Sequence, residues 1–92
     1  MYIFLNINKP KFVFDREIYV EIDYREGGDG YHEQQWREFD KLDVYKADWQ
    51  YSDGFGFYTI GDKINDVIQR ASDIYNFDLW GYIADRITEK LS

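Results

Sequence analysis

The spacing of hydrophobic residues changes once along this chain, near residue 62. Before that point apolar and polar residues alternate, most clearly at 17–25, where Ile18, Val20 and Ile22 alternate with acidic residues and a tyrosine. A period of two is typical of a strand with one buried face. Beyond residue 62 the apolar residues recur every three or four positions, as on a helix. This order predicts an α+β domain in which two C-terminal helices pack on an antiparallel sheet.

The sheet is expected to contain about five strands. They are drawn from the runs at 2–7, 11–14, 17–25 and 55–60 and from two strands within 31–51 that join near Asp40–Asp43. The runs at 2–7 and 11–14 are expected to pair as a hairpin around Asn8-Lys9-Pro10. The glycine-containing segments Glu26–Gly30 and Ser52–Gly54 are typical of turns, and a return strand is expected to begin near Tyr31.

The last third of the chain predicts two helices. The first would span 62–76, with Asp62 or Thr59 as its N-cap. Its apolar side would carry Ile64, Val67, Ile68, Ala71, Ile74 and Tyr75. Asn76-Phe77 would end this helix, and Asp78 would cap a second helix that runs to Leu91.

The length of 92 residues suits a single domain, 1–92. If compact, such a domain would have a radius of gyration of about 12 Å. The apolar content of 45% argues against disorder, and the absence of cysteine excludes a disulfide-stapled scaffold. The opening run Met1–Leu5 is too short for a signal peptide or a membrane span, so the expected location is the cytoplasm.

Acidic residues dominate the charge of the chain. Eighteen Asp and Glu oppose eleven Lys and Arg, which gives a net charge of −7. Direct binding to nucleic acid or to an anionic membrane is therefore not expected, because both depend on Lys and Arg. The expected partners are basic.

The acidic side chains are expected to form three rows that point away from the apolar sides of their elements. Two rows lie on the predicted helices and one on the strand at 17–25. The pairs Asp62 with Asp66 and Asp85 with Glu89 place like charges at i and i+4, an arrangement that destabilises a helix by about 0.2 to 0.5 kcal/mol each. We therefore interpret the rows as carboxylates that take the place of phosphates. The nine residues are Glu17, Glu21, Asp23, Asp62, Asp66, Asp73, Asp78, Asp85 and Glu89.

No combination of residues predicts an active site, a metal site or a cofactor site. His32 is the only histidine, and without a cysteine or a second histidine it cannot build a typical zinc site. We therefore expect a protein that is not an enzyme. Most of the nineteen aromatic residues are expected to fill the core, and Tyr31, Trp36, Trp49 and Tyr51 are candidates for an interface.

Two other functions remain open at this point. A small sugar- or peptide-binding module would use the aromatic residues as its site, with acidity serving solubility. An immunity-type inhibitor of a nuclease toxin would use the same carboxylates against a different partner. Binding that salt weakens steeply would favour carboxylates that take the place of phosphates, whether the partner is a DNA-binding protein or a nuclease toxin, over sugar binding.

The size, the acidity and the overall character of the sequence, including NINKPKFVFDREIYVEIDYREGGDGYHEQQW at Asn6–Trp36, resemble the anti-restriction nuclease proteins of the T-even bacteriophages, a family of DNA mimics. The resemblance implies that the chain acts in the infected host cell and blocks the DNA-binding surface of a host restriction endonuclease of the McrBC type. A histone-like nucleoid protein is a further implied target. A homodimer is implied as well.

Overall fold

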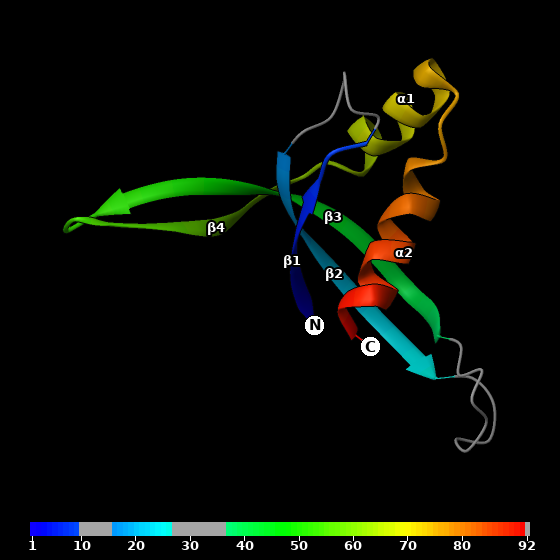
Figure 1. The fold of residues 1–92 in the computed structure, drawn as a ribbon, viewed down its shortest axis with the longest axis horizontal. Coiled ribbons are helices and arrows are strands. Elements are labelled where there is room, and N and C mark those ends of the chain that lie inside the picture. Colours follow the sequence, from blue (N-terminus) through cyan, green and yellow to red (C-terminus); the bar gives the residue numbers. More distant parts are fainter. Residues whose placement is uncertain (10–15, 27–36, 92) are drawn as a thin grey trace.

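The computed structural model describes residues 1–9, 16–26 and 37–91. Its described elements are the strands β1 (Tyr2–Ile7), β2 (Arg16–Glu26), β3 (Arg37–Ser52) and β4 (Phe55–Lys63), followed by the helices α1 (Asn65–Tyr75) and α2 (Leu79–Leu91). The strands form one antiparallel sheet in the order β1-β2-β3-β4, and both helices lie on one of its faces (Figure 1). The expected α+β class is confirmed, with four strands among the described residues in place of about five.

β1 pairs with β2 over its whole length, from Tyr2 opposite Glu21 to Ile7 opposite Arg16. The alternation predicted for β2 is confirmed, because Ile18, Val20 and Ile22 are buried. The expected strand 11–14, the loop 27–30 and the strand start near Tyr31 lie outside the described residues. Among the described residues β1 pairs with β2, and the expected hairpin with 11–14 falls outside them.

The prediction of two strands joined near Asp40–Asp43 is wrong, because β3 is continuous. Its pairing with β2 shifts between Asp23 opposite Lys41 and Tyr24 opposite Phe39, which leaves Asp40 as an extra residue in β3. Such a bulge lets residues three apart face the same side. Phe39 and Leu42 both pack against the core. The bulge therefore accounts for the three-residue spacing of Phe39 and Leu42 within one strand.

The outer halves of β3 and β4 form a two-stranded arm that extends beyond β1 and β2 (Figure 1). Asp53 and Gly54 close the arm with φ angles of 53° and 83°, as a two-residue type I′ turn requires, so the predicted turn is confirmed. The radius of gyration is 14.8 Å, larger than the value expected for a compact domain, and the molecule measures 47 × 36 × 19 Å. We call residues Ala47–Gly61 the arm.

The first helix begins three residues later than predicted, because β4 continues to Lys63. The backbone of Val44 in β3 holds the junction: its carbonyl accepts a hydrogen bond from the Ile64 N–H at 2.8 Å, and its N–H donates to Asn65 Oδ1 at 2.7 Å. Asp62 and Thr59 therefore lie in β4, and the prediction that one of them caps α1 is wrong. Ile64 occupies the N-cap without a side-chain hydrogen bond.

The boundary between the helices is confirmed. Asn76 adopts a left-handed conformation at the end of α1, with φ of 49°. Asp78 caps α2, since its Oδ1 accepts a hydrogen bond from the Gly81 N–H at 2.9 Å. The middle of β1 is bound to the other end of α2, where Lys90 Nζ donates to the Phe4 carbonyl at 3.3 Å.

The core lies between the sheet and the helices and is aliphatic. Its buried members are Ile3, Leu5, Ile7, Ile18, Val20, Ile22, Val44, Ile64, Ile68, Leu79, Ile83 and Ile87. Val67, Ile74 and Tyr75, which the pattern places on the buried side of the first helix, are exposed, because α1 rests on the sheet through Ile64 and Ile68. Within the described residues, neither helix is long and apolar enough to cross a membrane.

Candidate partner-binding surface

Glu17, Glu21 and Asp23 project from the face of the sheet that the helices leave open. This follows from the alternation in β2, because Ile18, Val20 and Ile22 point into the aliphatic core. Asp43 of β3 lies directly opposite Glu21 and joins them on this face. The row predicted for this strand is therefore present.

The helix carboxylates lie on the other side of the molecule. Asp66 and Asp73 are exposed on α1, and Asp85 and Glu89 are exposed on α2, half a turn from the buried Ile83 and Ile87. Asp66 sits in the first turn of α1, where the helix dipole favours an acid. The three rows do not share one face. The strand carboxylates project from the open face of the sheet, whereas the helix carboxylates project from the opposite side of the domain.

Two predicted members of the rows have different surroundings from those expected. Asp62 is exposed in β4, so its predicted helical pairing with Asp66 does not exist. Asp78 serves the fold, since its carboxylate caps α2. The pair Asp85 and Glu89 does stand on one helix, where Arg86 Nη1 lies 3.1 Å from Glu89 Oε2.

The strand carboxylates are partly neutralised within the chain. Lys41 Nζ lies 3.1 Å from Glu21 Oε1, and this contact lowers the pKa of Glu21. Asp43 accepts a hydrogen bond from Asn65 Nδ2 at 2.8 Å, and Lys63 Nζ lies 3.6 Å from its Oδ2, so its pKa is also lowered. Like charges opposite each other in a sheet are unfavourable, and these partners offset that repulsion. The sequence alone does not show that Asp43 lies opposite Glu21, because this depends on the register between β2 and β3.

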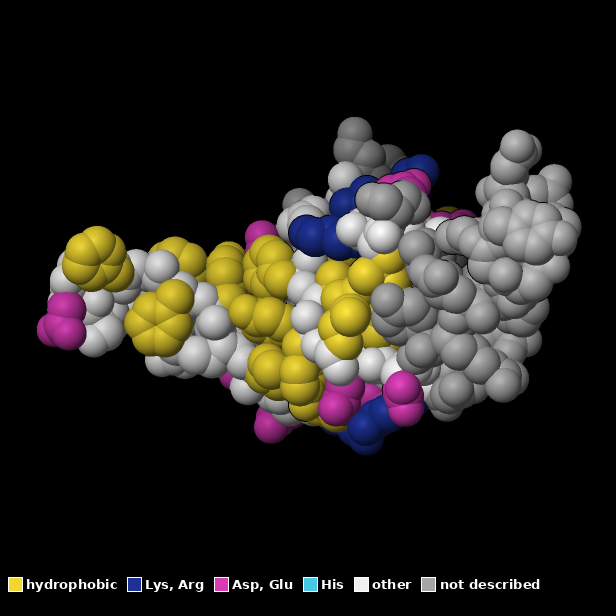
Figure 2. All heavy atoms as spheres, turned by 90° about the horizontal axis from the view of Figure 1, so that it is seen from below, with side chains coloured by type: hydrophobic (Ala, Val, Ile, Leu, Met, Phe, Trp, Pro, Cys, Tyr) yellow, Lys and Arg dark blue, Asp and Glu magenta, His cyan; other side chains and the backbone are white. Residues whose placement is uncertain are grey.

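Aromatic rings form a continuous cluster on the same open face. Trp49 contacts Tyr58 at a ring-centroid distance of 4.9 Å, Tyr58 contacts Phe4 at 5.2 Å, and Phe4 contacts Tyr19 at 5.3 Å. The hydroxyl of Tyr19 also donates to the Tyr58 carbonyl at 3.2 Å. These contacts fix the root of the arm against β1 and β2. Figure 2 shows hydrophobic side chains running along the arm into the body.

Tyrosine hydroxyls bind the strand carboxylates and so join the rings to the acids. Tyr45 donates to Glu21 Oε1 at 3.1 Å, and its pKa is raised by partial burial and by this bond. Partial burial and the neighbouring charge of Glu17 raise the pKa of Tyr58. We call this surface the aromatic-acidic face, and it consists of Tyr2, Phe4, Glu17, Tyr19, Glu21, Tyr45, Trp49 and Tyr58.

The predicted interface aromatics have separate outcomes. Trp49 and Tyr51 are exposed on the arm, with 58% and 71% of their surface accessible. Tyr31 and Trp36 lie outside the described residues. Phe55 and Phe57 are also exposed on the arm, on its opposite side, and sequence reasoning missed them because they fall in a strand predicted to join the sheet.

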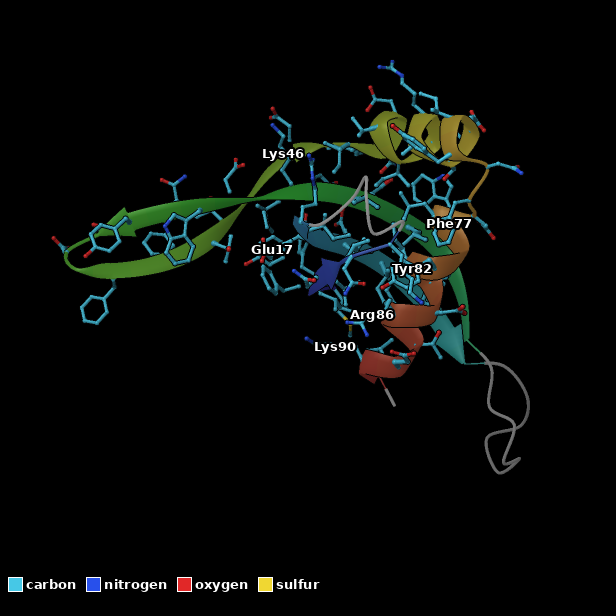
Figure 3. All side chains as sticks on the ribbon, turned by 45° about the horizontal axis from the view of Figure 1, so that its top comes forward. Glu17, Lys46, Phe77, Tyr82, Arg86 and Lys90 are labelled. Atoms are coloured by element: carbon cyan, nitrogen blue, oxygen red, sulfur yellow. The ribbon has the colours of Figure 1, made fainter. Side chains whose placement is uncertain are left out.

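An open cleft of about 210 Å³ lies at the root of the arm and is lined by Arg16, Glu17, Lys46, Ala47 and Asp48. Figure 3 labels Glu17 and Lys46 near the point where the arm leaves the body. Binding pockets for small molecules are usually larger, at about 300 to 1,000 Å³. Within 1–9, 16–26 and 37–91, no three acidic or histidine side chains are grouped so that they could hold a metal ion.

No protein-family model, curated protein or solved structure matches the chain.

Proposed function

We propose that this protein is a DNA mimic that occupies the DNA-binding surface of a basic host protein and keeps DNA out. One observation carries the proposal: none of the nine carboxylates predicted from the sequence is buried, and of these nine Glu21 and Glu89 form salt bridges within the described part of the chain. Carboxylates held at the surface can meet the Lys and Arg side chains that otherwise contact phosphates.

The proposed partner is a restriction endonuclease that cleaves DNA with modified cytosine, as the sequence resemblance implies, with a histone-like nucleoid protein as a further target. Binding would take place in the cytoplasm of an infected bacterium. A homodimer would extend the acidic surface, and sedimentation velocity tests this part of the proposal. A protein that sediments only as a monomer would contradict the homodimer and would not affect the proposal of DNA mimicry.

The position of the acids on both sides of the sheet determines the design of the test. The variant Asp66→Asn/Asp73→Asn/Asp85→Asn changes the helix side, and Glu17→Gln/Glu21→Gln/Asp23→Asn changes the open face by the same three charges. The assay is cleavage of a methylated plasmid by the endonuclease at increasing inhibitor concentration. Each variant is expected to weaken inhibition by roughly tenfold at low salt.

A competitive mechanism also predicts that added DNA relieves the inhibition in the same assay. Inhibition should also weaken between about 50 and 200 mM salt, as binding through neutralised charges does. Full inhibition by both triple variants, with unchanged melting temperatures, would overturn the assignment of the carboxylates.

The exposed rings of the arm favour a second candidate, the sugar-binding module, because indole and phenol faces stack on sugars. Glycan binding that is insensitive to salt and lost on Trp49→Leu would support it. Failure to bind any glycan would contradict the sugar-binding module and leave DNA mimicry as the single candidate function.

A further inference from the structure

We propose that the aromatic-acidic face binds arginine side chains of the basic partner, with the Trp49 indole as the stacking surface and the Glu17 carboxylate as the counter-charge. This inference rests on the proposed function and adds to it which side chain the open face recognises. It gives the exposed aromatic residues and the strand carboxylates a common role.

The indole of Trp49 is held in a fixed orientation before any partner arrives. It lies across Gly56 of the facing strand, where a Cβ atom would collide with its six-membered ring. Tyr58 packs against it edge to face, with 68° between the two ring planes. The backbone and Tyr58 therefore position the ring, while 58% of the residue stays exposed to a partner. A ring that is already positioned loses little conformational entropy on binding.

The protein already binds one of its own cations with a ring and a carboxylate. Lys63 Nζ lies 5.9 Å from the centroid of the Tyr45 ring and 3.6 Å from Asp43 Oδ2. A carboxylate and aromatic rings also lie together at the root of the arm. Partial burial and the nearby Glu17 carboxylate raise the pKa of Tyr58, and the Tyr58 ring packs against Trp49. Trp49 offers the better surface, because indole binds cations more strongly than phenol.

The charge of the arm selects a cation as the occupant. From Ala47 to Gly61 the sequence holds two aspartates and no lysine or arginine. A nucleic acid would be repelled, and a second copy of the chain would bring the same negative charges together. Arginine fits better than lysine because its planar guanidinium stacks on a ring and also binds a carboxylate through two N–H groups.

The experiment compares two peptides of equal charge, fluorescein-labelled deca-arginine and deca-lysine, by fluorescence anisotropy at low salt. The variant Trp49→Leu removes the stacking surface. Phe55→Leu is the matched control, because Phe55 is even more exposed, at 74%, and lies on the other side of the arm. The wild type is expected to bind the arginine peptide about five- to tenfold more tightly than the lysine peptide.

Trp49→Leu should reduce this preference to less than about twofold, because the arginine peptide loses both stacking and cation–π contact and is weakened more than the lysine peptide. Phe55→Leu should keep the preference. Equal binding of the two peptides by the wild type, or a preference that survives Trp49→Leu, would overturn the arginine site. A dimer that Trp49→Leu dissociates, with no preference for arginine, would assign this face to a second copy and also overturn it.

The outcomes separate the two proposals. Equal, salt-sensitive binding of both peptides contradicts only the arginine site and supports binding through carboxylates. A clear preference for arginine together with no inhibition of the endonuclease contradicts only the DNA mimic. Binding of neither peptide contradicts both.

Discussion

The two faces of the sheet use different chemistry. The face under the helices belongs to a core of twelve aliphatic residues from the sheet and the helices, and most of these are completely buried. The open face carries rings and carboxylates, and none of the described residues of the aromatic-acidic face is buried. Aliphatic burial contributes most of the stability of a small domain, whereas Tyr and Trp are typical of interfaces. The difference indicates that one face stabilises the fold and the other is available to a partner.

The largest effect is expected when the same side chain is removed from a buried and from an exposed environment. Ile83→Ala creates a cavity in the core, and we expect it to lower the free energy of unfolding by about 2 to 5 kcal/mol. Ile74→Ala, at a residue that is 64% exposed, should change it by less than about 0.5 kcal/mol. Urea denaturation measures both. Equal losses would mean that α1 packs through a different face.

A glycine substitution tests how firmly the open face is packed. Gly56→Ala places a methyl group in the ring of Trp49, and we expect it to cost about 1 to 3 kcal/mol of stability and to change the near-ultraviolet circular dichroism. Gly61→Ala is the control, because its methyl group meets only the movable carboxylate of Asp48. If both variants are as stable as the wild type, the indole is not held in place.

Asp78 tests which of the surface carboxylates serve the fold. Asp78→Ala removes the N-cap of α2 and should cost about 1 kcal/mol in thermal or urea unfolding. Asp85→Ala removes the same charge from the middle of that helix, where Asp85 forms no salt bridge with a described residue, and should have almost no effect. Similar losses in both variants would contradict the capping role.

The smallest effect concerns pH. Glu21 and Asp43 have pKa values in the folded protein below their usual values of 4.5 and 3.8. Their bonds therefore stabilise the fold above those values, and the contribution is lost as acid protonates the carboxylates. Lys41→Gln should raise the pKa of Glu21, as measured by NMR titration. The difference in free energy of unfolding between Lys41→Gln and the wild type should become smaller below about pH 4. Lys46→Gln is the control. An unchanged Glu21 pKa in Lys41→Gln would show that the ion pair does not form in solution.

Local patterns predicted those parts of the fold that local interactions determine. The alternation in β2, the end of α1 at Asn76 and the cap at Asp78 are examples. The bulge at Asp40 and the extension of β4 were missed, because distant strands create them: Val44 in β3 binds Asn65 and thereby delays the start of α1. The separation of the acidic rows could have been derived from the sequence. Once helices cover the apolar face of β2, its acids must point away from theirs.

The continuous strand β3 restricts how the length of this molecule can vary. One strand crosses the body and the arm without a break, so its side chains keep one alternation from Lys41 to Tyr51. A single inserted residue between the two parts would turn Trp49 and Tyr51 to the opposite side. Two inserted residues in each of β3 and β4 would lengthen the arm and preserve both faces. Arms of different length that keep the same surface should therefore differ in steps of two residues per strand.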